Sequence, residues 1–195
     1  MSYSLDSISD GCYPETNTLV NKLNLKDENE LDKYETLSSY AKATFLDTHP
    51  ISSNFDFNHY KSINKFLFED LYEWAGEIRT INLSKKGTIF CQVDKIEDCA
   101  ERIFERLKEM NYFKELPYDE YINEIVDFYC STNNLHPFRE GNGRTQRVFL
   151  TQLVKYAGHT INFSKTDPDL FMIATIQSAN GITDLLTKLF TEIID

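Results

Sequence analysis

A short segment of the chain gathers the residue types that bind anionic oxygen. Residues 136–147 read His-Pro-Phe-Arg-Glu-Gly-Asn-Gly-Arg-Thr-Gln-Arg. Gly141, Asn142 and Gly143 stand where a loop turns into a predicted helix, and the exposed N–H groups at such a helix start bind anions. Arg144 and Arg147 share one face of that helix, and the planar fork of arginine suits phosphate oxygens. The segment therefore predicts an anion cradle flanked by two cations.

His136 and Glu140 add a base and a metal ligand to this cradle. Glu140 is a hard oxygen ligand of the kind that Mg²⁺ accepts when phosphates fill most of its coordination shell. His136 precedes Pro137, which disfavours a helical conformation at His136. A neutral imidazole at this place could take the proton from an attacking hydroxyl. The combination indicates phosphoryl-type transfer, in which positioning and charge neutralisation supply most of the catalysis.

The elements that must position this segment are predicted to be mainly helical. The residues 77–93 alternate short apolar runs around a turn with glycine, which predicts a β-hairpin. The first helix should bury the apolar residues at helical spacing, which are Leu31, Tyr34, Leu37, Ala41 and Phe45. Capping residues and apolar stripes predict seven helices, over about 27–47, 60–76, 94–110, 118 onward, 143–157, 167 onward and 182–193.

These elements predict one domain, a helical bundle with one hairpin. Residues 1–24 are polar and rich in turn signals, so we expect an irregular N-terminal arm followed by a single domain over 25–195. The chain contains no internal repeat and no low-complexity tract. The four cysteines have no metal-ligand spacing and are interpreted as reduced thiols.

Composition narrows the class of partner. The net charge of −11 disfavours a protein that grips nucleic acid, because that task needs clustered Lys and Arg. No apolar run is long enough to cross a membrane, and the first residues lack the pattern of a signal peptide. We therefore expect a cytoplasmic protein with a protein or small-molecule partner and no direct contact with nucleic acid or membrane.

The segment 136–147 resembles the Fic-family signature HxFx[DE]GNGRxxR at every specified position. The similarity covers roughly residues 27–190 and implies a Fic-type helical bundle with a hairpin flap. It implies a protein adenylyltransferase that moves AMP from ATP to a Ser, Thr or Tyr hydroxyl. In that role His136 would be the base, Phe138 would anchor the loop, and Glu140 would bind Mg²⁺. The remaining signature residues would hold the phosphates of ATP; they are Gly141, Asn142, Gly143, Arg144 and Arg147.

The resemblance also implies how a target would bind. The hairpin over Ser84–Cys91 would pin an extended segment of the target protein by strand addition. Lys86 and Gly87 at its turn would also contact the nucleotide, and the adenine pocket is expected between Ile173 and Leu186. Resemblance to stand-alone bacterial Fic toxins suggests an essential bacterial target, such as a type II topoisomerase subunit.

Two alternative functions stay open. The related Doc branch resembles HxFxxANKR, where a lysine takes the place of Gly143 and a phosphate is transferred instead of AMP. The glycine favours AMP transfer over this branch. Another metal-assisted phosphoryl transfer would use His136 and Glu140 as metal ligands, and it is disfavoured because one His and one carboxylate are too few for a tight metal site. A catalytically inactive binding module is the second alternative, which the intact signature disfavours.

A regulatory pattern of many Fic proteins is absent from the sequence. That pattern, [ST]xxxE[GN], carries a glutamate that pairs with the second arginine of the signature. No glutamate of this chain has Ser or Thr four residues before it. The resemblance is therefore to toxins that a separate small antitoxin inhibits, with Arg147 as the residue that the antitoxin's glutamate would contact.

Overall fold

The computed structural model describes residues 11–52, 54–85 and 87–195. Over these residues the chain is mainly helical and has one two-stranded hairpin, as predicted. The first ten residues of the expected arm lie outside the described residues. The α-helices are α1 Glu28–Thr48, α2 Phe57–Phe68, α3 Ile96–Glu109, α4 Tyr118–Leu135, α5 Asn142–Tyr156, α6 Pro168–Ser178 and α7 Asp184–Ile193.

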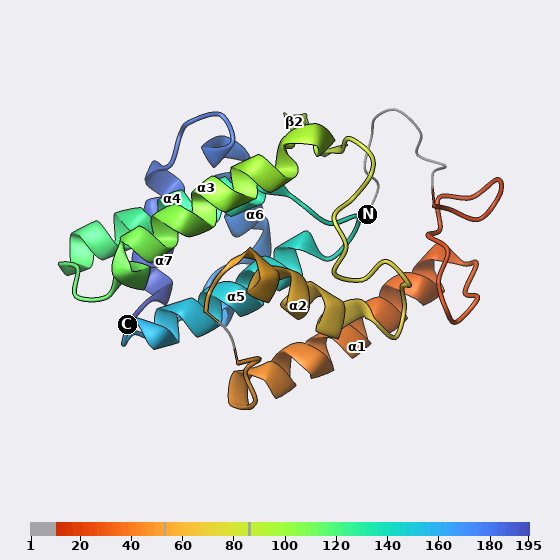
Figure 1. Ribbon diagram of the computed structural model, residues 1–195, viewed down its shortest axis with the longest axis horizontal. Coiled ribbons are helices and arrows are strands. Elements are labelled where there is room, and N and C mark those ends of the chain that lie inside the picture. Colours follow the sequence, from red (N-terminus) through yellow and green to blue (C-terminus); the bar gives the residue numbers. More distant parts are fainter. Residues whose placement is uncertain (1–10, 53, 86) are drawn as a thin grey trace.

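Helix α5 lies at the centre of the bundle. It packs against α1, α2 and α4, while α3 and α7 pack on α4, and α6 packs on α7 (Figure 1). Phe149 of α5 is fully buried and contacts the rings of Tyr60, Phe104 and Phe128 from three other helices. Because Phe149 anchors α5 in the core, the first turn of α5 is fixed beside the predicted loop.

Local sequence signals set several helix ends. Asp27 caps α1 by accepting a hydrogen bond from the Glu30 N–H at 3.0 Å. Asp167 caps α6 in the same way, and Pro168 occupies the first turn, where its missing N–H costs nothing. Helix α5 is followed by Gly158 with φ +95°, as the predicted stop requires.

Four local predictions need correction. Helix α2 ends at Phe68 instead of continuing to Gly76, because turns after Phe68 bury Leu71 and Tyr72. The hairpin is short: β1 is Ser84–Lys85 and β2 is Thr88–Ile89, paired antiparallel with Ser84 opposite Ile89. Asp94 does not cap α3, since it lies inside a short 3₁₀ turn over Val93–Lys95.

The fourth correction concerns the buried face of α1. The predicted stripe is largely exposed, with Leu37 at 72%. Leu31 is buried as predicted, and the rest of the buried face carries Glu35, Ser39 and Leu46. Apolar spacing failed here because α1 turns two polar side chains toward α5, which brings them to the site described below.

Two further observations concern the predictions about membrane spans and cysteines. No helix among the described residues has the length and apolar character to span a bilayer. All four cysteines are free thiols, each partly buried.

Candidate active site

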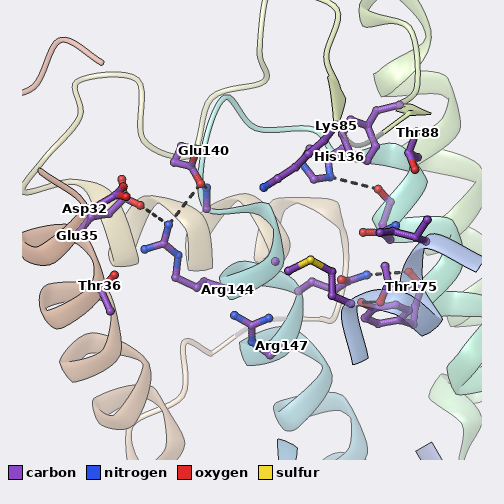
Figure 2. A pocket seen from close by; sticks show the side chains of 18 residues that line it. Asp32, Glu35, Thr36, Lys85, Thr88, His136, Glu140, Arg144, Arg147 and Thr175 are labelled. Carbon is purple, nitrogen blue, oxygen red and sulfur yellow. Dashed lines mark hydrogen bonds and ion pairs between the residues drawn. The ribbon is translucent and has the colours of Figure 1, made fainter. Parts of the chain in front are cut away.

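The predicted loop lines a cavity of about 450 Å³. The cavity wall comes from α1, the hairpin, the end of α4, the loop, the start of α5 and α6. Six of the residues predicted from sequence line it: His136, Glu140, Gly141, Gly143, Arg144 and Arg147. Figure 2 shows Arg144 between Glu35 and Glu140 on one side of the cavity, with His136 and Lys85 on the other. A cavity of this size accommodates a nucleotide-sized ligand.

His136 closes α4 in a left-handed conformation, with φ 42° and ψ 58°. The sequence predicted that Pro137 would exclude a helical conformation at this residue, and the left-handed geometry agrees. The His136 ring stacks on Phe90 at the base of the hairpin, with 3.7 Å between centroids. Its backbone carbonyl accepts a hydrogen bond from Arg79 Nε at 2.8 Å. The hairpin thus holds the imidazole, and the buried arginine holds the backbone that carries it.

The protonation state of His136 follows from its surroundings. Its Nδ1 lies 3.3 Å from the carbonyl oxygen of Asn133, which can only accept, so Nδ1 carries the proton and Nε2 carries the lone pair. Burial lowers the pKa of His136 to about 3; the Asn133 carbonyl opposes this shift, and the charges of Lys85 and Arg79 add to it. The ring is therefore a neutral base at physiological pH.

Asn142 and Gly141 shape the loop. The Asn142 side chain accepts from the Phe138 N–H at 2.9 Å and donates to the Phe138 carbonyl at 2.8 Å. This pair of bonds closes the loop, and Phe138 itself is fully buried against Tyr60. Gly141 has φ +80°, and a Cβ there would overlap the Phe68 ring, with Cδ2 at 2.9 Å and two ring atoms closer still. Only glycine fits this position.

The first turn of α5 presents donors to the cavity. In the described part of the chain, no group accepts from the backbone N–H groups of Gly143 and Arg144. A Cβ at Gly143 would meet only Arg147 Nη1, at 3.6 Å, so the space above this turn is open. Together with the positive end of the helix dipole, these groups can bind an anion.

The two arginines differ in their contacts. Arg144 is bound to Glu35 of α1, to Ser39 Oγ at 3.1 Å and to Glu140 Oε1 at 3.4 Å. Arg147 is exposed, and no ion pair or hydrogen bond joins its guanidinium to another described residue. Glu140 Oε1 also accepts from the Gly141 N–H at 2.7 Å. One arginine is thus fixed by protein acids, and the other is available to a ligand.

The hairpin residues fall into three groups. Lys85 and Thr88 line the cavity, while Gly87 lies at the turn with φ +81° and outside the lining. Lys86 lies outside the described residues. Within the range expected for the adenine pocket, Thr175 and Ile176 line the cavity, and Met172 lies just before that range.

Sequence reasoning missed four residues that organise the site. Glu35 and Tyr72 bind one another beside Arg144, with 2.5 Å between the hydroxyl and carboxylate oxygens. Arg79 is 3% exposed and donates to the carbonyls of His136, Ile81 and Cys91. Asn64 is fully buried and donates to the Glu140 carbonyl at 3.2 Å. In the sequence, only the spacing of Glu35 from Leu31, which places both on one face of the helix, could have indicated that Glu35 is buried.

Comparison with known proteins shows which family this chain resembles. A family described as Fic/DOC matches residues 54–154, which is just over half of the chain. The "Probable protein adenylyltransferase y4lH" of Sinorhizobium fredii is 40% identical over 173 residues, covering 87% of this chain and 88% of the relative. Protein adenylyltransferase VbhT of Bartonella schoenbuchensis is 36% identical over 176 residues, or 90% of this chain and 37% of that longer protein.

Solved structures agree with the sequence comparison. BepC, a VirB-translocated effector protein of Bartonella tribocorum solved with bound AMPPNP, superimposes with a TM-score of 0.89 at 28% identity. The match covers 95% of this chain and 96% of BepC. With its signature loop, its helical bundle and a match over more than half of its length, the chain belongs to the Fic/DOC family.

Proposed function

We propose that this chain is a protein adenylyltransferase, which moves AMP from ATP to a Ser, Thr or Tyr hydroxyl of a target protein. The observation that carries the proposal is the convergence of His136, Glu140, Arg144 and Arg147 on one cavity. Curated relatives named as adenylyltransferases and the AMPPNP-bound BepC support it.

His136 acts as the general base. Its Nε2 lone pair takes the proton of the target hydroxyl as that oxygen attacks the α phosphorus of ATP. The new bond joins the hydroxyl oxygen to AMP, and the bond to the β phosphate breaks, so pyrophosphate leaves. Stacking on Phe90 and the Asn133 hydrogen bond hold the ring at the attack position.

Arg144, Arg147 and the first turn of α5 bind the phosphates. The free N–H groups of Gly143 and Arg144 receive phosphate oxygens, and Arg147 adds an open guanidinium. The space above Gly143 leaves room for the triphosphate, which favours AMP transfer over the Doc-like arrangement. Neutralisation of the phosphate charge supplies most of the catalysis.

The residues present fit Mg²⁺ when it is bound chiefly by the nucleotide. Glu140 offers one hard carboxylate in the cavity, and the described residues contain no cluster of three or more ligands that could hold the metal alone. Such a site matches the preference of Mg²⁺ for one or two carboxylates plus phosphates. When bound, the ion would neutralise charge on the α and β phosphates.

The hairpin and α6 serve recognition. We assign the wall of Met172, Thr175 and Ile176 to the adenine base and the Ser84–Cys91 hairpin to an extended segment of the target. Exposed Ile89, at 70%, offers an apolar contact to such a segment. Lys86 and Gly87 at the turn are assigned to the nucleotide on the resemblance alone.

Regulation by a separate protein completes the proposal. Arg147 has no described acid partner, and no glutamate stands in the inhibitory pattern. We assign the chain to a toxin of a toxin–antitoxin pair, acting in the cytoplasm on a target such as a type II topoisomerase subunit. A small antitoxin would inhibit it by placing a glutamate on Arg147.

One labelling experiment separates the candidate functions. The protein is incubated with cell lysate and with ATP labelled at either the α or the γ phosphate. AMP transfer predicts that only the α label becomes bound to protein. Protein-bound γ label would indicate the phosphate transfer of the Doc branch, and neither label would indicate a binding module.

A further inference from the structure

Glu35 is an acid of the first helix that reaches the active site from outside the signature. It is 6% exposed, and its carboxylate forms an ion pair with Arg144 across 109 positions of sequence. The other carboxylate oxygen accepts a hydrogen bond from the Tyr72 hydroxyl at 2.5 Å. Figure 2 shows Glu35 of α1 and Glu140 of the loop both joined to Arg144.

The contacts of Arg144 leave part of its guanidinium for a ligand. Of the five N–H donors that arginine has, Ser39 takes one from Nη1, and Glu35 and Glu140 each take one from Nη2. The Nε donor and the second Nη1 donor have no acceptor among the residues that the structure describes. The guanidinium also lies over the Phe68 ring, with 4.8 Å from Cζ to the centroid. Its plane is therefore fixed on one face and along one edge, and two donors remain for phosphate oxygen.

Glu35 is itself held in place. Burial and the charge of Glu140 raise the pKa of Glu35, whereas Arg144 and the Tyr72 hydroxyl oppose that shift. Burial also raises the pKa of Tyr72, so its hydroxyl keeps the proton that it donates. The Tyr72 ring in turn stacks on Trp74 at 4.2 Å between centroids. A carboxylate held from both sides cannot swing away when a nucleotide enters.

A glutamate beside Arg144 could either compete with phosphate for the guanidinium or hold the guanidinium in position, and the geometry distinguishes the two. A competitor for phosphate must leave its arginine when the nucleotide binds, which requires a mobile, solvated side chain. Glu35 is buried and bonded to Tyr72, and it accepts from Nη2, whereas the remaining donors are on Nε and Nη1. It therefore orients the guanidinium without covering the donors that a phosphate would use.

We propose that Glu35 is a positioning residue, which with Tyr72 and Ser39 fixes the guanidinium of Arg144 for the terminal phosphates of ATP. The inference rests on the proposed function, since it assigns Arg144 to those phosphates. Arg144 is the prearranged cation of the site, whereas no described residue holds the guanidinium of Arg147 by a hydrogen bond or ion pair. Prearrangement adds affinity because the side chain loses little freedom when the ligand binds.

The test is the binding of a nonhydrolysable ATP analogue and of AMP to Glu35→Gln, measured by calorimetry. Gln keeps the shape but lacks the charge, and its single amide oxygen can accept from only one of the two donors, Arg144 and Tyr72. We expect the ATP analogue to bind at least about tenfold more weakly, the loss of one charge-assisted hydrogen bond. AMP should bind as to the wild type, because it lacks the terminal phosphates. The exposed neighbour Glu30→Gln is the matched control and should change neither affinity.

Other outcomes overturn the inference. If Glu35→Gln leaves the ratio of the affinities for the ATP analogue and for AMP unchanged, Glu35 has a purely structural role. If Glu35→Gln binds the ATP analogue more tightly, Glu35 competes with the phosphates for Arg144. If Glu35→Gln does not fold, Tyr72→Phe removes only the hydroxyl. It should also lower the ratio of the affinity for the ATP analogue to the affinity for AMP. Wild-type protein that binds the ATP analogue without transferring AMP would count against the proposed function and leave this inference intact; failure of the wild type to bind the ATP analogue would refute both.

Discussion

Gly141 offers the sharpest test of how the loop is built. Its φ of +80° costs an alanine about 1–2 kcal/mol. The new methyl would also overlap the buried Phe68 ring, and overpacking of a core adds about 1–3 kcal/mol. Gly141→Ala should therefore lower the free energy of unfolding by about 2–5 kcal/mol, a large part of the stability of a typical domain. Urea denaturation followed by circular dichroism measures this loss.

A control and a double variant separate the two contributions. Gly158 has φ +95° with no atom within 4 Å of the position that a Cβ would take, so Gly158→Ala should show the backbone cost alone. Phe68→Leu in the Gly141→Ala background removes the overlap and keeps the strain. We expect the two substitutions to be coupled by about 1–3 kcal/mol. Equal losses for Gly141→Ala and Gly158→Ala, or no coupling with Phe68, would refute the packing argument.

Three further predictions concern the base, its support and the phosphate site. Because the pKa of His136 is lowered to about 3, the folded chain binds its proton only below that pH, whereas the unfolded chain binds one below about 6.5. As pH falls below 6.5, His136 therefore lowers the free energy of unfolding, by about 2 kcal/mol at pH 5. In urea titrations at several pH values, His136→Asn should lose this part of the pH dependence of the unfolding free energy. An unchanged pH dependence would contradict the lowered pKa of His136. Arg79→Met leaves the buried carbonyl of His136 and the part-buried carbonyls of Ile81 and Cys91 without their donor. At about 1–3 kcal/mol for each unsatisfied group, it should lower the free energy of unfolding by about 3–5 kcal/mol. The exposed control Arg102→Met should change it very little, and equal effects would show that these hydrogen bonds contribute little. Gly143→Lys should fold normally, since the Cβ of a residue there meets only Arg147 Nη1, at 3.6 Å. The lysine should lower incorporation of the α label at least about tenfold by filling the phosphate space. Unchanged incorporation would place the phosphates elsewhere.

The bundle and the loop could be predicted because their signals are local. Asp27, Pro168 and Gly158 mark helix ends through capping and backbone preferences that depend only on neighbouring residues. The His-to-Arg segment carries its residues within a single loop and turn, so their meeting at one cavity followed from spacing alone. Helix α2 ended earlier than predicted because tertiary packing buried Leu71 in a turn, which apolar spacing does not distinguish from a helix.

The support of the site could not be predicted for a physical reason. Glu35, Arg79 and Asn64 meet the loop across tens of residues, and each is a polar side chain that sequence patterns assign to the surface. Their burial is stable only because partners on other elements satisfy them. Such pairing is a property of the folded bundle, so it has no signature in the sequence of α1 alone.

The most direct test of the central claim compares wild-type protein with His136→Ala, using ATP labelled at the α phosphate and a lysate that contains the target. We expect protein-bound α label with the wild type and a loss of at least about a hundredfold in the initial rate with His136→Ala. Nucleotide affinity should be nearly equal for the two proteins, because His136 contacts the hydroxyl and not the phosphates. Undiminished labelling by His136→Ala would contradict the claim that this histidine is the base for AMP transfer.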